Sequence, residues 1–338
     1  MSDLIGRMPK AELHVHLEGT VSPDTLWRLA RDNGVALPVA SLEELRALYR
    51  FESFDTFLQL WLLMCRCFQR PEDYERMVDA FVEECRRQNI RYVEAHFTPY
   101  NHERFGIGGR RALEVVTRRI EALPADAPVV RLILDIPSES VPESGPFTAA
   151  LLEELANPVV VAIGLGGPEE GFPRRLVAEH YRRARRAGYP AVAHAGETAG
   201  ADHVRQAVLE LGVRRVQHGV RAVEDPEVLR LLAEREVCCD VCLTSNEYLT
   251  VYRELRTHPL RRMMAAGVPV TLGSDDPPFF GTDLVREYER ARDELGLTLE
   301  ELWQIDLNGL RYALCDTVLR RRLMLEFAAE GARLGLAS

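Results

Sequence analysis

Short apolar runs alternate with longer segments of helical periodicity along the whole chain. A continuous run of Val, Ile, Leu and Ala between polar residues is typical of a strand buried on both faces, and such strands alternate with helices in parallel sheets. The pattern therefore predicts an α/β fold in which eight strands close into a (β/α)8 barrel, the TIM barrel. The predicted strands are Glu12–His16, Arg91–Phe97, Val129–Ile136, Val159–Leu165, Ala191–His194, Arg215–His218, Val237–Val241 and Val268–Leu272.

Segments with a period near 3.6 residues separate these strands and predict the outer helices. No repeat, low-complexity tract or linker interrupts the alternation, so we expect a single barrel domain over residues 1–338, with residues 137–146 as a loop. The predicted helices are Tyr74–Gln88, Arg110–Ala122, Pro146–Leu155, Arg174–Ala187, Ala201–Leu211, Pro226–Arg235, Pro259–Ala266, Arg286–Leu295 and Leu299–Leu314.

About 70 residues separate the first two predicted strands, which is too many for one crossover helix. We therefore expect extra helices above the barrel. Within this segment, Ser53–Phe68 carries apolar residues on all sides. It predicts either a helix packed in the core or a helix that forms a lid over an active site, and its periodicity does not separate the two.

Composition and charge narrow the choice of partners. The 338 residues are 46% hydrophobic with a net charge of −10, and the arginines are scattered, so we expect no nucleic-acid partner. The chain lacks a basic region before an apolar run and any apolar stretch of membrane-spanning length, which predicts a soluble, cytoplasmic protein without a membrane partner. The sequence neither predicts nor excludes a homo-oligomer. Seven cysteines without the paired C-x-x-C spacing of a structural zinc site are expected to be free thiols.

Polar residues end several of the predicted strands, and the active site of such a barrel lies at the C-terminal ends of its strands. These residues are His14, His16, His194, His218 and Asp275. Because His14 and His16 lie two apart on an extended strand, both imidazoles point to the same side, and we expect all five side chains to meet. The remaining histidines are expected to be structural: His96, His102, His180, His203 and His258.

These residue types predict a mononuclear zinc centre. Three neutral imidazoles and one carboxylate leave a position open for water, and zinc lowers the pKa of that water towards neutrality. Glu197 follows His194 by three residues and can act as the general acid, whereas His218 can take the proton from the water. Lys10 is the only lysine and precedes the first predicted strand. A carbamylated-lysine binuclear centre, a Schiff base and a phosphate-binding G-x-x-x-x-G-K-[ST] loop are therefore excluded.

At these residues the chain resembles the adenosine deaminase family of the amidohydrolase superfamily. The resemblance implies that the protein hydrolyses the cyclic amidine C–N bond of a 6-aminopurine nucleoside, giving the 6-oxo product and ammonia. Its motifs stand in family order and span nearly the whole chain. They are Pro9-Lys10-Ala11-Glu12-Leu13-His14-Val15-His16-Leu17-Glu18-Gly19-Thr20, His194-Ala195-Gly196-Glu197, His218-Gly219 and Ser274-Asp275-Asp276-Pro277.

The resemblance also implies a role for each site residue. Glu197 would protonate purine N1, and His218 would orient and deprotonate the hydrolytic water. Asp276 would hydrogen-bond to N7, and the Gly167 amide to N3. The implied ligands of one zinc ion per chain are His14, His16, His194 and Asp275. The implied apolar lid residues, which favour the lid over the core helix, are Phe57, Leu58 and Trp61.

Three departures from the family pattern concern the substrate. Adenosine-specific members usually carry Asp at the position of Glu18, which meets the ribose 5′-hydroxyl, so the resemblance implies that Glu18 contacts the substrate. Adenine-specific members also tend to carry Glu there, but they usually have serines in place of Gly166-Gly167. Asp135-Ile136-Pro137-Ser138 lacks an arginine common in adenosine members. The combination looks most like deaminases of 6-aminodeoxyfutalosine, a menaquinone precursor with a 5′ carboxyphenyl group. Arg66 or Arg70 could meet that carboxylate, but an exposed helix charge is the favoured interpretation of each.

Other functions remain as alternatives. Adenosine or adenine deamination in purine salvage would use the same residues on another small-molecule purine. A purine-binding regulator without catalysis would be expected to have lost a catalytic residue, yet all are present. A zinc hydrolase of esters or lactones would have no use for the Asp276 and Gly167 pair.

Overall fold

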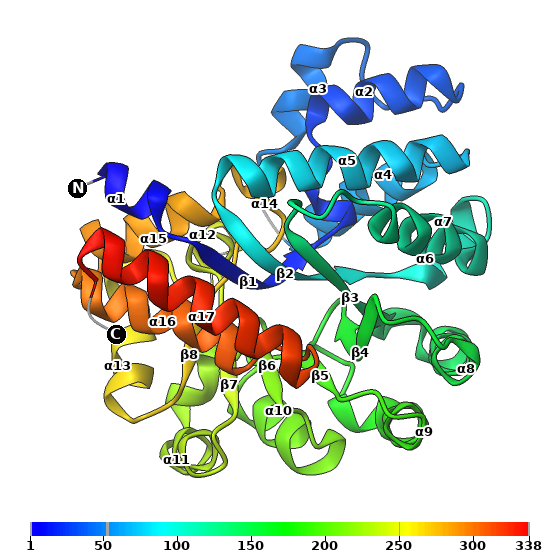
Figure 1. Ribbon diagram of the computed structural model, residues 1–338. Helices are drawn as coiled ribbons and strands as arrows, with labels where there is room; N and C mark the ends of the chain where they lie inside the picture. The colour runs from blue at the N-terminus through cyan, green and yellow to red at the C-terminus, as the bar shows by residue number, and fades with distance from the viewer. Residues whose placement is uncertain (1, 52–53, 250, 337–338) are drawn as a thin grey trace.

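The computed structural model describes residues 2–51, 54–249 and 251–336, and its strands form a parallel barrel (Figure 1). Strands β1 to β4 pair in order, as do β5 to β8. Isolated parallel bridges join Ile163 to Ala191 and Val15 to Asp275, so both gaps between the two groups are bridged. The predicted (β/α)8 barrel is confirmed. The strands are β1 (Lys10–His16), β2 (Ile90–Phe97), β3 (Val129–Pro137), β4 (Val160–Gly166), β5 (Val192–Ala195), β6 (Arg215–His218), β7 (Cys238–Val241) and β8 (Val270–Leu272).

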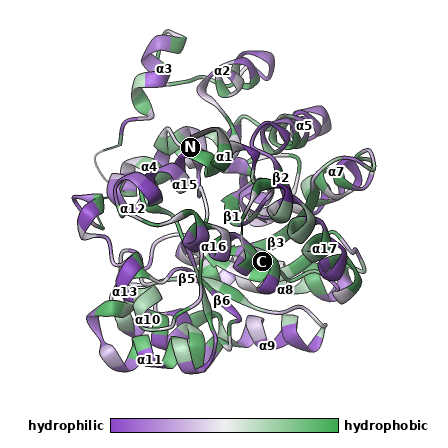
Figure 2. Cartoon of the chain, turned by 60° about the vertical axis from the view of Figure 1, so that its left-hand side comes forward, coloured by the Kyte–Doolittle hydropathy of each residue, from purple (hydrophilic) through white to green (hydrophobic). Residues whose placement is uncertain are grey.

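Helices surround the barrel, and Figure 2 shows hydrophobic and hydrophilic residues together on outer helices such as α5 and α7, as expected where one face packs inward. They are α1 (Ser2–Arg7), α2 (Pro23–Asp32), α3 (Leu42–Leu48), α4 (Phe54–Arg66), α5 (Pro71–Arg87), α6 (Pro99–Phe105), α7 (Gly109–Glu121), α8 (Val141–Glu154), α9 (Ala178–Arg186), α10 (Ala201–Gln206), α11 (Pro226–Glu234), α12 (Leu243–Tyr248), α13 (Leu260–Ala265), α14 (Pro277–Phe280), α15 (Leu284–Asp293), α16 (Leu299–Arg311) and α17 (Thr317–Leu334). None of these helices, over the ranges described, has both the length and the apolar character of a membrane span.

Several predicted boundaries were wrong. The expected loop at residues 137–146 is a 3-10 turn, η2 (Ser138–Ser140), followed by the first turns of α8. Pro142 lies in the first turn of α8, where the missing N–H costs no hydrogen bond, although Pro146 lies inside the helix. The predicted helix at residues 174–187 divides into η3 (Arg174–Val177) and α9, and β1 begins at Lys10, two residues before the predicted start.

The long segment between β1 and β2 supplies the predicted extra helices, α2 to α4, before the crossover helix α5. Ser53, at the start of the predicted lid helix, lies outside the described residues, and α4 begins at Phe54. The Phe57 ring packs on Phe279 and Phe280 of α14, with centroids 5.6 and 5.4 Å apart. This contact joins α4 to the loop that follows β8, where the candidate metal ligand Asp275 lies.

The barrel interior contains ionic groups below the candidate site. Arg215 is fully buried on β6, with nitrogen atoms 2.7 Å from a Glu94 oxygen and 2.8 Å from an Asp240 oxygen. Burial lowers the pKa of this guanidinium, but the two carboxylates outweigh that effect and raise it above its usual value. The paired charges satisfy one another inside the barrel. All seven cysteines are buried and free, as expected.

Candidate metal centre and active site

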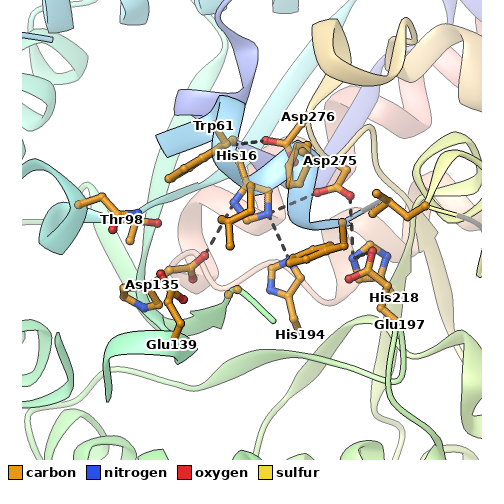
Figure 3. Close-up of a pocket in the computed structure, with 18 residues that line it drawn as sticks. His16, Trp61, Thr98, Asp135, Glu139, His194, Glu197, His218, Asp275 and Asp276 are labelled. Carbon is orange, nitrogen blue, oxygen red and sulfur yellow. Dashed lines mark hydrogen bonds and ion pairs between the residues drawn. The ribbon is translucent and has the colours of Figure 1, made fainter. Parts of the chain in front are cut away.

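The barrel brings the five predicted strand-end residues together. His14 and His16 come from β1, His194 from β5 and His218 from the end of β6, and Asp275 follows β8. Figure 3 shows His16, His194, His218 and Asp275 around one centre, with Glu197 beside His218. All are buried except His16, which is partly exposed. The side chains therefore meet at the C-terminal end of the barrel, where catalytic groups of this fold lie.

Four of these residues place ligand atoms at spacings that suit zinc. His194 Nε2 lies 3.2 Å from both His14 Nε2 and His16 Nε2. Asp275 Oδ1 lies 3.6 Å from His14 Nε2 and 3.4 Å from His16 Nε2. Four ligands held about 2.1 Å from a central zinc ion in a tetrahedron would lie about 3.4 Å apart. These four spacings fit one zinc ion, whereas the group whose potential ligand atoms all lie within 4.8 Å of one another contains His218 in place of His16.

Neighbouring groups orient the imidazoles for this role. His14 Nδ1 lies 2.8 Å from the Asp240 carbonyl oxygen, and His194 Nδ1 lies 2.7 Å from that of Leu165. A ring nitrogen that donates to a carbonyl must carry the proton, so Nε2 of each ring presents its lone pair to the centre. Ser245 donates to Asp275 Oδ2 at 2.6 Å and fixes the carboxylate as well.

Two site residues have an unusual backbone. The φ angles of His218 and Asp275 are +60° and +62°, in the left-handed region that side chains other than Gly rarely adopt. Each residue terminates or follows a barrel strand, where its side chain takes part in the site. Strain of this kind tends to be kept at functional sites.

The charges of the site favour a cation at its centre. Burial lowers the pKa of His16, but the acidic groups around it, Asp275 among them, outweigh it and raise that pKa to about 10. These acidic groups favour the form of His16 that carries a proton and a positive charge. A metal ion would replace that proton with a larger positive charge.

Glu197 lies beside the candidate metal centre, and its surroundings suit a general acid. Burial, and then the charge of Asp275, raise the pKa of Glu197 well above its usual value, which favours the protonated form of the carboxyl. His218 Nε2 lies 3.5 Å from Glu197 Oε1. The loop is held in place by Glu169, whose Oε2 accepts from the backbone N–H groups of Glu197 at 3.1 Å and Ala199 at 2.6 Å.

Asp276 is the second carboxyl at the site with a raised pKa. Burial raises its pKa well above the usual value, although His16 lowers it. Trp61 of α4 donates from Nε1 to Asp276 Oδ1 at 3.2 Å (Figure 3). Gly19 makes this position available, because a Cβ there would lie 1.7 Å from Asp276 Oδ1. The sequence motif around His14 and His16 therefore includes a glycine for steric reasons.

A pocket opens over the metal centre and contains most of the predicted substrate contacts. Gly167 has φ +83°, and a Cβ at this position would lie 2.6 Å from Glu139 Oε2, so only glycine fits. None of the residues described as lining the pocket is Lys or Arg. The lining comprises His16, Phe54, Phe57, Leu58, Trp61, Thr98, Asn101, Asp135, Pro137, Glu139, Gly166, Gly167, His194, Glu197, His218, Leu249, Asp275 and Asp276.

Glu18 lies behind the pocket wall. It is fully buried, accepts from the Thr98 N–H at 2.8 Å and lies 3.3 Å from His102 Nε2. The second oxygen, Oε2, has no partner among the described residues. Glu18 therefore supports the wall at Thr98, and it is absent from the lining.

Sequence reasoning missed several residues that contact the site. His96, expected to be structural, ends β2 with Nδ1 2.9 Å from Asp135 Oδ1, and its ring centroid lies 5.0 Å from that of His16. Asn246 of α12 lies 3.1 Å from His218 Nδ1. Position at a strand end could have indicated Asp135. No pattern marked Asn246, which lies on a six-residue helix too short to show periodicity.

The fold and the donor set together define a metal-dependent hydrolase of the amidohydrolase type. The family model for adenosine deaminase matches residues 9–329. The chain therefore belongs to the adenosine deaminase family of the amidohydrolase superfamily, as the sequence motifs predicted, and it is a hydrolytic purine deaminase.

Relatives of this chain include adenine deaminases and aminodeoxyfutalosine deaminases. An adenine deaminase of Bordetella parapertussis is 33% identical over 310 residues, covering 92% of this chain and 98% of its own. An aminodeoxyfutalosine deaminase of Acidothermus cellulolyticus is 36% identical over 324 residues, covering 94% and 90%. The two levels of identity do not separate the substrates.

Solved structures agree with the fold. The adenine deaminase of Arthrobacter aurescens matches with a TM-score of 0.90 at 30% identity, covering 95% of this chain and 98% of its own. An amidohydrolase of Burkholderia ambifaria with bound Zn matches with a TM-score of 0.91 at 28% identity, covering 99% and 93%.

Proposed function

We propose that this protein is a zinc-dependent deaminase that hydrolyses a 6-aminopurine to its 6-oxo product and ammonia. The spacing of the four donor atoms and the zinc in the Burkholderia ambifaria relative support the choice of metal. Zinc held by His14, His16, His194 and Asp275 would act as a Lewis acid that makes water a nucleophile at neutral pH.

The pocket offers hydrogen-bond donors where a purine has acceptors. Purine N1, N3 and N7 are all acceptors, and the proposed partners are the protonated Glu197, the Gly167 N–H and the protonated Asp276. The raised pKa values of the two buried carboxyls are the observation that carries this proposal, because an ionised carboxylate could not donate. Glu197 would pass its proton to N1 as water attacks C6, while His218 orients that water. One proton of the water would leave with the amino group in ammonia, and the other would return to Glu197.

For the substrate, we propose 6-aminodeoxyfutalosine, with adenine and adenosine as alternatives. The aminodeoxyfutalosine deaminase relatives support the first and the adenine deaminases the second. The acidic lining would repel the carboxylate of 6-aminodeoxyfutalosine. We therefore expect a positively charged partner for this carboxylate outside the lining.

Two arginines on helices that contribute residues to the pocket lining suit this role. Arg66 on α4 and Arg104 on α6 each lie 4.8 Å from the centroid of the Phe105 ring. Both are exposed, and neither lies within ion-pair distance of a carboxylate in the ranges described. Helix α6 also carries the lining residue Asn101, one turn before Arg104. Arg70, the other sequence candidate, instead donates to the Asp32 carbonyl oxygen.

Ammonia release by the zinc-loaded protein tests this proposal with adenosine, adenine and 6-aminodeoxyfutalosine. We expect the highest kcat/KM for 6-aminodeoxyfutalosine, and a higher value for either other purine would contradict that choice. Bound zinc without ammonia from any of the three would instead favour a purine-binding regulator.

The double variant Arg66→Ala/Arg104→Ala tests the recognition of the carboxylate. It should lower kcat/KM for 6-aminodeoxyfutalosine by about tenfold or more, because each charge-assisted hydrogen bond contributes about 1.5–3 kcal/mol. Turnover of adenine should not change. Arg110→Ala, an exposed arginine on α7, is the control. An equal loss on both substrates, or no loss, would contradict the assignment.

A further inference from the structure

A chain of hydrogen bonds extends behind His218, on the side away from the metal centre. His218 Nδ1 lies 3.1 Å from Asn246 Nδ2, and Asn246 Oδ1 lies 3.1 Å from His258 Nε2. His258 Nδ1 accepts from the backbone N–H of Leu260 at 3.2 Å. Asn246 lies on α12 and His258 immediately before α13, and all three side chains are buried. Neither Asn246 nor His258 lines the pocket.

The backbone N–H of Leu260, at the far end of this series of hydrogen bonds, fixes the direction of each hydrogen bond in it. A backbone N–H can only donate, so His258 Nδ1 is an acceptor and the proton of the neutral ring is on Nε2. Burial lowers the pKa of His258 to about 3, which keeps the ring neutral. His258 Nε2 then donates to Asn246 Oδ1, which turns the amide N–H of Asn246 towards His218.

The amide orientation then sets the proton on His218. Because Asn246 Nδ2 donates, His218 Nδ1 must accept, and the neutral ring carries its proton on Nε2. The reversed amide would donate to His258 Nε2, leaving that ring with two acceptor nitrogens and no proton. Only one arrangement satisfies all three hydrogen bonds.

We propose that Asn246 and His258 are positioning residues that hold His218 as an Nε2–H donor facing the reacting water. The inference rests on the proposed deaminase function, in which His218 contacts that water. It replaces the role predicted from the sequence, where His218 accepts a proton, with a hydrogen bond from His218 that orients the oxygen for attack. No proton transfer is assigned to His218.

The proton on His218 Nε2 also determines which imidazoles can bind the metal. His14, His194, His218 and Asp275 form one group whose potential ligand atoms lie within 4.8 Å of one another. A nitrogen that carries a proton has no lone pair for a metal. His218 is therefore kept out of the coordination sphere, and His16 supplies the third imidazole.

Nitrogen-15 NMR of the histidine rings in the zinc-loaded protein tests the proposal without reference to activity. The His218 signals are assigned by their loss in His218→Gln. We expect a protonated Nε2 and an unprotonated Nδ1 for both His218 and His258. A proton on His218 Nδ1 in the wild-type protein would overturn the inference even if the protein deaminates purines, whereas lack of turnover on every 6-aminopurine would refute only the function.

Variants test whether the orientation matters for turnover of 6-aminodeoxyfutalosine. Asn246→Asp offers His218 an acceptor, so the proton should move to Nδ1, with kcat at least about tenfold lower and KM little changed, since residue 246 touches no substrate. His258→Gln keeps an N–H near the Nε2 position and should retain kcat, whereas His258→Phe should lose it. His180→Gln, outside the chain of bonds, is the control. Full kcat in both Asn246→Asp and His258→Phe would overturn the inference.

Discussion

Burial sets the protonation of individual side chains around the metal centre. It lowers the pKa of His218 to about 3, so the imidazole is neutral, and it raises the pKa of Glu197 well above its usual value, which favours the protonated carboxyl. A neutral imidazole N–H is too weak an acid to protonate a purine nitrogen, whereas a carboxyl group can. Activity should therefore fall as the pH rises through the pKa of Glu197.

The variant Asp275→Ala tests whether residue 275 is a ligand of the metal ion. The substitution removes one of four donors and the only anionic one, so bound zinc and turnover should both fall by orders of magnitude. Metal analysis after dialysis, together with ammonia release, measures both. Asp202→Ala, at an exposed carboxylate on α10, is the control. A fully metallated Asp275→Ala protein would show that residue 275 is not a ligand.

Helix α4 links the segment between β1 and β2 to the chemistry at the barrel end. Its Phe57, Leu58 and Trp61 line the pocket, and the Trp61 indole donates to Asp276. One helix therefore both covers the pocket and orients a proposed purine contact.

Trp61→Phe tests this double role. The ring volume is largely kept, but the hydrogen bond to Asp276 is lost, so kcat/KM should fall by about tenfold, equivalent to about 1.4 kcal/mol. Thermal stability should change little. Trp27→Phe, on the half-buried face of α2, is the matched control. Unchanged kinetics in Trp61→Phe would contradict a functional role for the indole.

The elements that the sequence predicted well are those with a repeated pattern. The eight strands could be located because short runs rich in Val, Ile, Leu and Ala recur between the helical segments, and the strand-end histidines and Asp275 followed from their positions. Helices α12 and α17 were not predicted. Helix α12 has only six residues, too few to show a helical period. Helix α8 begins at Val141, but its prolines are typical of a loop, and the sequence therefore predicted a later start. The contacts of Glu18 with Thr98 and His102 join residues about 80 positions apart, which periodicity cannot reveal.

The molecule as a whole buries its only lysine at the end of the barrel opposite the pocket. Lys10 begins β1, and its Nζ donates to the carbonyl oxygens of Met8 at 2.8 Å and Gln88 at 3.0 Å. Burial lowers the pKa of Lys10 from 10.5 to about 8, although Asp306 raises it. Between these two values the unfolded chain holds a proton that the folded chain has lost. Lys10 therefore makes the free energy of unfolding increase as the pH rises from about 8 to 10.5.

Lys10→Met should remove this contribution. Urea denaturation at several pH values between 8 and 10.5 would measure the difference in unfolding free energy between wild-type and variant proteins. We expect the wild-type protein to gain stability relative to Lys10→Met as the pH rises. Arg118→Met, at an exposed residue that does not titrate in this range, should give no such trend. A constant difference for Lys10→Met would show that the folded lysine keeps an ordinary pKa.

Ammonia release by Glu197→Gln, measured beside its zinc content, tests the proposed chemistry most directly. The amide keeps the shape of the side chain but cannot deliver a proton to purine N1. The variant should retain one zinc ion per chain while kcat on 6-aminodeoxyfutalosine falls by at least about a hundredfold. Turnover near the wild-type rate in a fully metallated Glu197→Gln protein would contradict deamination through this acid.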